Sequence, residues 1–296
     1  MKKFIIIDAN AIIHRAFHAL PNLTSKKGEA VGALYGFILF FLKTVKEHNP
    51  DFIAAAFDVH ALTFRHKEYK DYKATRKKAP DELYSQIPLV KDFLKAAGVS
   101  VFEKKGYEAD DVIGTIANMA PSSVEVIIMT GDLDALQLVN KNIKVFSLKK
   151  GIKEGVFYDE EKVKERYLGL SPGQLLEYKA LRGDPSDNIP GIFGIGEKTA
   201  IEIIKKFSNL ENLYDNFEKE GILKEGLIEK IKKGKDIAFI SRGLSEIKKD
   251  VPLSFDIEKC LYQKEEKKVV AFLKKYGFNS LILRFLEKEK KNMTLF

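Results

Sequence analysis

Residues 4–8 read Phe4-Ile5-Ile6-Ile7-Asp8, a short apolar run that ends in an acidic side chain. Such a run, with little polar alternation, is typical of a strand that is buried on both faces of a parallel sheet. It is shorter than the apolar core of a signal peptide, which needs about 7–15 residues. The start of the chain therefore predicts an internal β-strand.

Working outward from this strand, similar runs recur through the first half of the chain, separated by longer segments with helical periodicity. Alternation of strands and helices with right-handed crossovers predicts an α/β fold with a three-layer, mostly parallel sheet. The expected strands are Phe4–Ile7, Phe52–Phe57, Val99–Phe102, Val124–Met129 and Ile143–Leu148, and the clearest helices between them are Val31–His48 and Leu83–Ala97.

From about Tyr158 onward the pattern becomes helical, with short loops and no repeat or low-complexity linker. We expect residues 1–157 to form the α/β core, residues 158–286 a helical part, and residues 287–296 a charged tail. The helices expected in the second part are Glu160–Tyr167, Pro172–Leu181, Glu197–Phe207, Lys224–Ile240 and Glu265–Tyr276.

Composition excludes several classes of protein. The 296 residues include 50 Lys and Arg against 42 Asp and Glu, a formal net charge of +8 that permits a nucleic-acid partner. The single cysteine, Cys260, excludes a disulfide framework and a thiolate zinc cluster. Apolar stretches stay well short of the roughly 18 residues of a membrane span, so we expect a soluble cytoplasmic protein.

Acidic residues follow several of the predicted strands, at the edge of the sheet where sites form in parallel α/β folds. Another acidic group opens a helix, and a last pair lies in a turn rich in Gly and Pro. An isolated acid of this kind is usually only a helix cap, and Asp8 could cap a helix over residues 11–19. The nine acids are Asp8, Asp58, Glu108, Asp110, Asp111, Asp132, Asp134, Asp184 and Asp187.

Gathering so many acids requires cations between them. Two carboxylates ~5 Å apart repel by roughly 3 kcal/mol at an effective dielectric constant of ~20. An all-oxygen ligand set favours Mg²⁺ or Mn²⁺ over zinc. Two such ions can activate water and stabilise both oxygens of an in-line phosphoryl displacement. The spacing of the acids thus predicts a metal-dependent phosphoryl-transfer or hydrolysis site.

Residues 60–80 differ from the rest of the chain, because they contain seven Lys or Arg against two acids but few aliphatic residues. Cations near metal ions would stabilise charge on a phosphate, and aromatic side chains offer stacking surfaces for unpaired bases. A solvated loop remains the alternative interpretation.

Five ordered motifs together resemble the 5′-nuclease domain of bacterial DNA polymerase I, within the flap endonuclease family. The resemblance covers about residues 1–285. The motifs are Phe4-Ile5-Ile6-Ile7-Asp8; Phe57-Asp58 followed by Phe64-Arg65; Tyr107-Glu108-Ala109-Asp110-Asp111; Thr130-Gly131-Asp132-Leu133-Asp134; and Gly183-Asp184-Pro185-Ser186-Asp187-Asn188-Ile189-Pro190-Gly191.

The resemblance implies a PIN-like or 5′-nuclease-like fold and a metal-dependent 5′–3′ exonuclease and flap endonuclease. Its expected substrates are 5′ flaps, nicks and 5′ ends of DNA and RNA primer–DNA hybrids, cut by two-metal-ion catalysis in replication and repair. All nine acids fall on the family's metal-site carboxylates. Asp110, Asp132 and Asp134 resemble the ligands nearest the catalytic metal pair, and Asp184 and Asp187 the more distal ones.

By the same resemblance, residues 60–80 form a helical arch through which a single-stranded 5′ end passes. Lys73 and Arg76 match arch residues that steer the scissile phosphate, so we assign them a catalytic role. His14 and His18 are expected to be packing residues. Further DNA contacts are expected from Arg15, Phe64, Arg65, Lys70 and Tyr72.

Residues 191–200 resemble the family's helix–hairpin–helix, which we place within about residues 173–207. Its glycines let backbone N–H groups approach a phosphate at a helix start, which binds duplex DNA without reading its sequence. A K⁺ ion commonly occupies this hairpin in the family. A dinucleotide-binding loop is disfavoured because no buried strand precedes it. The expected contacts are Gly191, Gly194, Gly196, Lys198 and Thr199.

The last five residues resemble the Gln-Leu-x-Leu-Phe peptide that binds the bacterial sliding clamp, with Asn292 in place of Gln. Met293, Leu295 and Phe296 would then enter a pocket on the clamp, unless the terminus is simply frayed. The chain ends where a polymerase would continue, so we expect a stand-alone, monomeric, nucleoid-associated nuclease without polymerase activity.

Three other functions remain as alternatives. A scaffold could hold flap DNA without cutting it, and a PIN-type ribonuclease would share the acidic sheet edge. A phosphatase of the haloacid dehalogenase type would place a second Asp two residues after Asp8, where this chain has Asn10. Cleavage of matched DNA and RNA flaps separates these functions.

Overall fold

A computed structural model describes residues 1–20, 23–25, 28–151 and 154–286 of the chain. Six strands form one sheet in the order β3-β2-β1-β4-β5-β6, and only β5 and β6 pair antiparallel. The strands span Lys2–Asp8 (β1), Phe52–Ala56 (β2), Ser100–Phe102 (β3), Val124–Thr130 (β4), Ile143–Lys150 (β5) and Glu154–Tyr158 (β6).

The central strand β1 positions the rest of the sheet. Its side chains alternate between the two faces, so that Phe4 and Ile6 join one buried cluster while Ile5 and Ile7 join the other. Burial on both faces explains why the run lacks polar residues. The predicted three-layer α/β fold with a mostly parallel sheet is confirmed, and only β6 was not expected.

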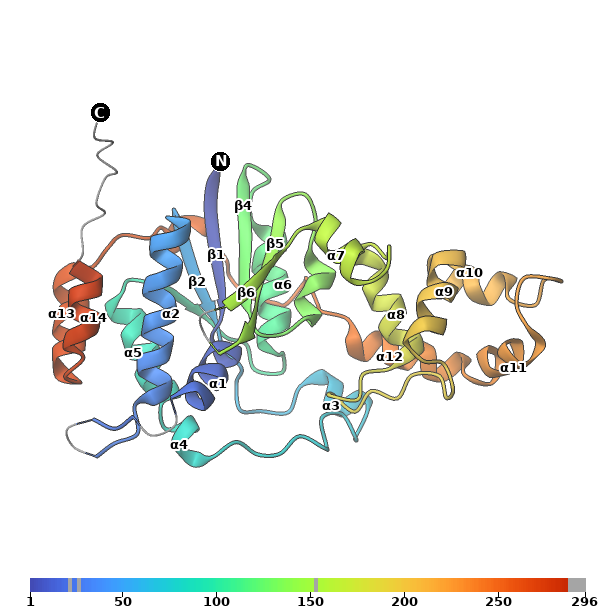
Figure 1. The fold of residues 1–296 in the computed structure, drawn as a ribbon, viewed down its shortest axis with the longest axis horizontal. Helices are drawn as coiled ribbons and strands as arrows, with labels where there is room; N and C mark the ends of the chain where they lie inside the picture. The colour runs from blue at the N-terminus through green and yellow to red at the C-terminus, as the bar shows by residue number, and fades with distance from the viewer. Residues whose placement is uncertain (21–22, 26–27, 152–153, 287–296) are drawn as a thin grey trace.

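Helices cover both faces of the sheet (Figure 1). One face packs against α1, α2, α5, α13 and α14, and the other against α6, α7 and the helical part of the chain. These helices span Ala9–Ala19 (α1), Gly32–His48 (α2), Ile87–Ala96 (α5), Ala109–Met119 (α6), Glu160–Arg166 (α7), Glu266–Lys275 (α13) and Asn279–Leu286 (α14).

The remaining helical part lies beside the sheet, at the right of Figure 1. Where the sequence predicts one helix over Lys224–Ile240, the structure has two that meet at Gly234. Ile192 fills the space beside this glycine, since its Cγ2 would lie 2.6 Å from a Cβ there. The helices are Leu175–Arg182 (α8), Glu197–Phe207 (α9), Leu210–Asn216 (α10), Glu225–Lys233 (α11) and Lys235–Ser245 (α12).

The segment predicted as a helical arch contains little helix. Only Phe64–Glu68 (α3) and, after it, Asp81–Tyr84 (α4) are helical, and the residues between them form turns and extended chain. The N–H of Lys73 donates to the carbonyl of Asp187 over 2.9 Å, which fastens the turn to a loop of the helical part. Lys73 has a φ of +56°, a conformation that is uncommon for residues other than glycine.

Helices α13 and α14 return to the α/β core, although the sequence predicts that residues 158–286 form one helical part. An aromatic seam, defined by Phe41 on α2, Phe93 on α5 and Phe272 on α13, joins the three helices. The ring of Phe93 lies 5.3 Å from that of Phe41 and 5.7 Å from that of Phe272. Over the described ranges, no helix is both long and apolar enough to cross a membrane.

We predict that Phe93→Ala lowers the free energy of unfolding by about 3–5 kcal/mol, because it empties the centre of the aromatic seam. Chemical denaturation followed by circular dichroism measures this change. Phe157→Ala, which truncates a partly exposed ring on β6, is the matched control and should change stability much less. Equal effects of the two substitutions would contradict the proposed packing role.

Candidate active site

Five acids from different elements line one pocket of about 760 Å³ at the carboxyl edge of the sheet. The parallel register aligns the ends of β1, β2 and β4, and α6 brings its first turn to the same edge. Cationic side chains of α1 and of residues 60–80 line the pocket as well. The acids are Asp8, Asp58, Glu108, Asp110 and Asp132, and the cations are Arg15, Lys73 and Arg76.

Asp8 is both a helix cap and a member of the pocket. Its Oδ1 accepts the N–H of Ala11 over 3.0 Å, and its Oδ2 accepts the hydroxyl of Thr130 over 2.6 Å. Burial, together with the neighbouring acids Asp58 and Asp132, raises the pKa of Asp8 to about 7 despite these two hydrogen bonds. The carboxyl of Asp8 is therefore harder to ionise in the pocket than in water.

The pKa values of the next two acids along this edge of the sheet are raised as well. Burial, with Asp132 and Asp8 nearby, raises the pKa of Asp110 well above its usual range. Burial raises the pKa of Asp134 to about 7, although the ammonium of Lys179 opposes this shift. A carboxyl that resists ionisation among other acids is the electrostatic signature of a site suited to cations.

Lys179, on α8, bridges two of the predicted acids and was missed by the sequence analysis. It contacts Asp134, and its Nζ donates to Oδ2 of Asp184 over 2.7 Å. Burial alone would raise the pKa of Asp184, but Lys179 and the hydrogen bonds from Ser186 lower it to about 2. The only sequence signal was a lysine one helical turn before the Gly183 turn.

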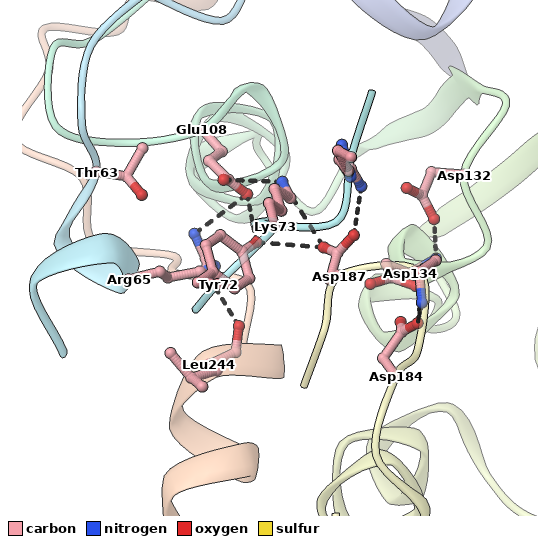
Figure 2. A network of polar contacts seen from close by, with 12 residues as sticks. Thr63, Arg65, Tyr72, Lys73, Glu108, Asp132, Asp134, Asp184, Asp187 and Leu244 are labelled. Carbon is pink, nitrogen blue, oxygen red and sulfur yellow. Dashed lines mark hydrogen bonds and ion pairs between the residues drawn. The ribbon is translucent and has the colours of Figure 1, made fainter. Parts of the chain in front are cut away.

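A second network joins residues 60–80 to Glu108 and Asp187 (Figure 2). The hydroxyl of Tyr72 donates to Glu108 Oε2 over 3.0 Å and to Asp187 Oδ2 over 3.2 Å. Lys73 Nζ lies 2.8 Å from Glu108 Oε1 and 3.7 Å from Asp187 Oδ2, and Arg76 also pairs with Asp187. The two predicted catalytic cations therefore face the acids directly.

Asp111 does not belong to the pocket, which corrects its assignment as a metal ligand. Its side chain has no solvent exposure and forms a bidentate ion pair with Arg65, with N···O distances of 2.7 and 2.8 Å. The same two oxygens accept the N–H groups of Glu108 and Lys248. With its acceptor positions occupied, Asp111 joins α3, α6 and the chain after α12 instead of holding an ion.

Two predicted DNA contacts are also corrected, because their side chains are only 3% exposed. Arg65 is held by Asp111 and by the carbonyls of Leu244 and Glu246. Tyr72 packs against Ile189 and Leu244, so its ring presents no face on which a base could stack.

The other residues predicted to contact DNA, and the two nearby histidines, differ in how exposed they are. Arg15 lines the pocket, but its guanidinium donates to the carbonyl of Gly131 over 2.9 Å. Phe64 is half-buried, with Arg65 4.5 Å from its ring centre, whereas Lys70 is exposed. His14 and His18 line the pocket rather than packing in the core.

The predicted hairpin precedes α9. Gly196 is the N-cap residue, and Gly196 and Lys198 are exposed while Thr199 is half-buried. Gly191 and Gly194 have φ values of +64° and +78°, which glycine adopts without strain. The clamp-binding residues Met293, Leu295 and Phe296 lie outside the described residues.

The pocket acids suit Mg²⁺ or Mn²⁺ in chemistry. They offer only oxygen ligands, and burial followed by neighbouring acids raises the pKa values of Asp8 and Asp110, so a cation bound there would favour their ionised forms. Within the described part of the chain, no three His, Cys, Asp or Glu side chains are already arranged to hold a metal ion.

The chain matches known proteins both in sequence and in fold. A family model described as 5′–3′ exonuclease, N-terminal resolvase-like domain, matches residues 3–168, and one described as 5′–3′ exonuclease, C-terminal SAM fold, matches residues 170–268. DNA polymerase I of Caldicellulosiruptor bescii is 42% identical over 95% of this chain and 33% of its own length. For DNA polymerase I of Bacillus subtilis the values are 40%, 97% and 32%. The chain thus spans about a third of these relatives.

Solved structures share the fold at lower sequence identity. T5 5′-exonuclease with bound zinc ions has a TM-score of 0.68 at 21% identity, covering 97% of this chain and 100% of that one. The catalytic core of Rad2 in complex with DNA substrate has a TM-score of 0.58 at 16% identity, covering 96% and 93%.

We predict that Asp111→Ala lowers the free energy of unfolding by about 3–5 kcal/mol, because it removes the bidentate partner of the buried Arg65 and leaves only Glu108, whose Oε2 lies 3.6 Å from the guanidinium. Asp132→Ala should change stability by less than about 1 kcal/mol, since it removes a partly exposed acid from among other acids. Denaturant titration of both variants tests this contrast. An unchanged midpoint for Asp111→Ala would restore that residue as a candidate ligand.

Proposed function

The chain belongs to the 5′–3′ exonuclease family, and we propose that it is a structure-specific nuclease that cuts 5′ flaps and 5′ ends of DNA. The observation that carries this proposal is the convergence of Asp8, Asp58, Glu108, Asp110 and Asp132 in one pocket that Lys73 and Arg76 also line. Acids that favour metal ions, together with cations that favour a phosphate, form a site suited to phosphodiester hydrolysis.

We propose that Asp8, Asp110 and Asp132 hold divalent ions at the sheet edge, with Asp58 and Glu108 beside them. Asp134, Asp184 and Asp187 lie next to the pocket and would act more distally, where Lys179 now bridges the first two. When bound, two or more Mg²⁺ or Mn²⁺ ions would supply an activated water and offset charge on the attacking and leaving oxygens.

Lys73 and Arg76 supply the phosphate contact in this proposal. Both now pair with acids, so substrate entry would exchange a carboxylate partner for a phosphate oxygen. Their attachment to the turn at residues 70–75 fixes where the scissile phosphate lies relative to the acids. Arg76 would hold the phosphate in a more defined orientation than Lys73, because its planar guanidinium can donate hydrogen bonds to two phosphate oxygens at once.

The segment 60–80 and the hairpin would receive different parts of the substrate. A single-stranded 5′ end would pass along residues 60–80 into the pocket, while the hairpin before α9, with a K⁺ ion, would hold duplex backbone. RNA primer–DNA hybrids fit the same proposal, since backbone contacts do not read the sugar or base. We further propose that the protein acts as a monomer and that its C-terminal peptide binds the sliding clamp.

The proposal is tested with a labelled 5′-flap duplex in Mg²⁺. The wild type should cut near the flap junction, whereas Asp132→Asn should abolish cleavage and retain or strengthen DNA binding, because it removes an ion ligand and a negative charge together. Glu103→Gln, which changes an exposed acid outside the pocket, should cut normally. Binding without cleavage by the wild type would favour a scaffold instead, and preference for the matched RNA flap would favour a ribonuclease.

We predict that Lys73→Ala slows single-turnover cleavage about 10²-fold at saturating DNA, because it removes charge aimed at the reacting phosphate. Lys77→Ala is the matched control, since this exposed lysine on the same segment does not line the pocket. Rapid-quench kinetics separates the chemical step from binding. Equal slowing by both substitutions would indicate general electrostatic attraction instead.

A further inference from the structure

Phe193 is almost completely exposed at the tip of the hairpin before α9. Its relative exposure is 96%, whereas the isoleucines that flank the tip, Ile192 and Ile195, are only 3% and 4% exposed. An isolated surface hydrophobic residue is ordinary, but a full phenyl ring at the apex of a fixed turn is not. The aromatic side chain is therefore available to a partner.

The turn that carries Phe193 is anchored on both sides. The N–H of Ile192 donates to the carbonyl of Leu181 over 2.8 Å, and the N–H of Ile195 donates to that of Ile192 over 3.1 Å. Gly191 lies so close to the preceding chain that a Cβ there would be 2.3 Å from the nitrogen of Gly183. The ring is thus presented on a preorganised support, which limits the entropy lost on binding.

Two lysines lie beside the hairpin, and one acid, Glu197, shares the first turn of α9 with one of them. Lys230 on α11 reaches across to the hairpin, where its Nζ donates to the carbonyl of Gly194 over 3.2 Å. Lys198 is exposed on the first turn of α9, and no side chain caps the start of that helix. An apolar tip between ammonium groups matches a partner that combines phosphates with an apolar surface between them.

We propose that Phe193 is a positioning residue that enters the minor groove of the duplex next to the flap. This inference rests on the proposed function and goes beyond it, since it adds an apolar contact to a hairpin expected to contact phosphates. The minor groove is about 6 Å wide and walled by sugars, which suits one ring on a tight turn, whereas the major groove is about 12 Å wide and admits a whole helix. Apolar wedges of this type enter from the minor groove.

This arrangement separates two contributions to binding. Lys198 and Lys230 would supply salt-dependent attraction to the backbone, and Phe193 would supply a contact that salt does not screen. The ring would fix how the duplex lies relative to the hairpin while remaining remote from the reacting phosphate. Its loss should therefore affect DNA binding rather than the chemical step.

The test compares Phe193→Ala with the wild type, using fluorescence anisotropy on a fluorescently labelled duplex in EDTA, where cleavage does not occur. We expect a Kd about 5–150-fold higher for duplex DNA, the range that loss of one aromatic–nucleotide contact gives. The salt slope should be unchanged, whereas Lys198→Ala should reduce it by about one. Single-turnover cleavage at saturating flap DNA should keep its wild-type rate, and Phe193→Tyr should restore affinity.

A matched control is Leu283→Ala, which truncates an exposed residue on α14, at the opposite end of the molecule from the hairpin (Figure 1). Its duplex Kd should equal that of the wild type. An unchanged Kd for Phe193→Ala, or an equal loss on single-stranded DNA, would overturn the inference while leaving the nuclease proposal intact. Failure of the wild type to cut any flap, by contrast, would overturn the nuclease proposal itself.

Discussion

Carboxylates that are crowded at one edge of a sheet repel one another, and the structure offsets this repulsion with its own cations. Lys179 lies between Asp134 and Asp184, while Lys73 and Arg76 face Glu108 and Asp187. These pairs link elements that are far apart in sequence, so the same electrostatic requirement joins the sheet, residues 60–80 and the helical part. The fold of the site and the metal binding that we propose for it would have one physical origin.

The position of strand β1 determines where these acids lie. Because it is the centre of a parallel sheet, its register with β2 and β4 brings Asp8, Asp58 and Asp132 to the same edge. Packing on both faces holds the strand rigidly, which suits a site whose ligands must keep their positions. By contrast, the acids at Asp184 and Asp187 reach the edge only through the helical part, so they depend on how that part packs.

Much of the fold and of the acidic site could be predicted from the sequence, because the spacing of apolar and polar residues within one segment determines whether it forms a strand or a helix. The strands ending at Asp8 and Thr130 and the gathering of acids follow from patterns in a single stretch of chain. Three features could not be predicted in that way. Lys179 becomes part of the site, Arg65 pairs with Asp111 outside the pocket, and the predicted helix is divided at Gly234, where Ile192 leaves no room for a Cβ. Each of these features depends on partners distant in sequence. A motif gives residue types, whereas burial decides which of their atoms remain accessible.

The return of the chain to β2 has a consequence for how the protein is made. The N–H of Tyr262 bonds to the carbonyl of Asp51, and α13 completes the seam around Phe93. The chain must therefore leave the ribosome as far as α13 before this layer can close. Until then, nascent chains would display uncovered aromatic rings, and termination before α13 would yield a product prone to aggregation rather than a smaller folded domain.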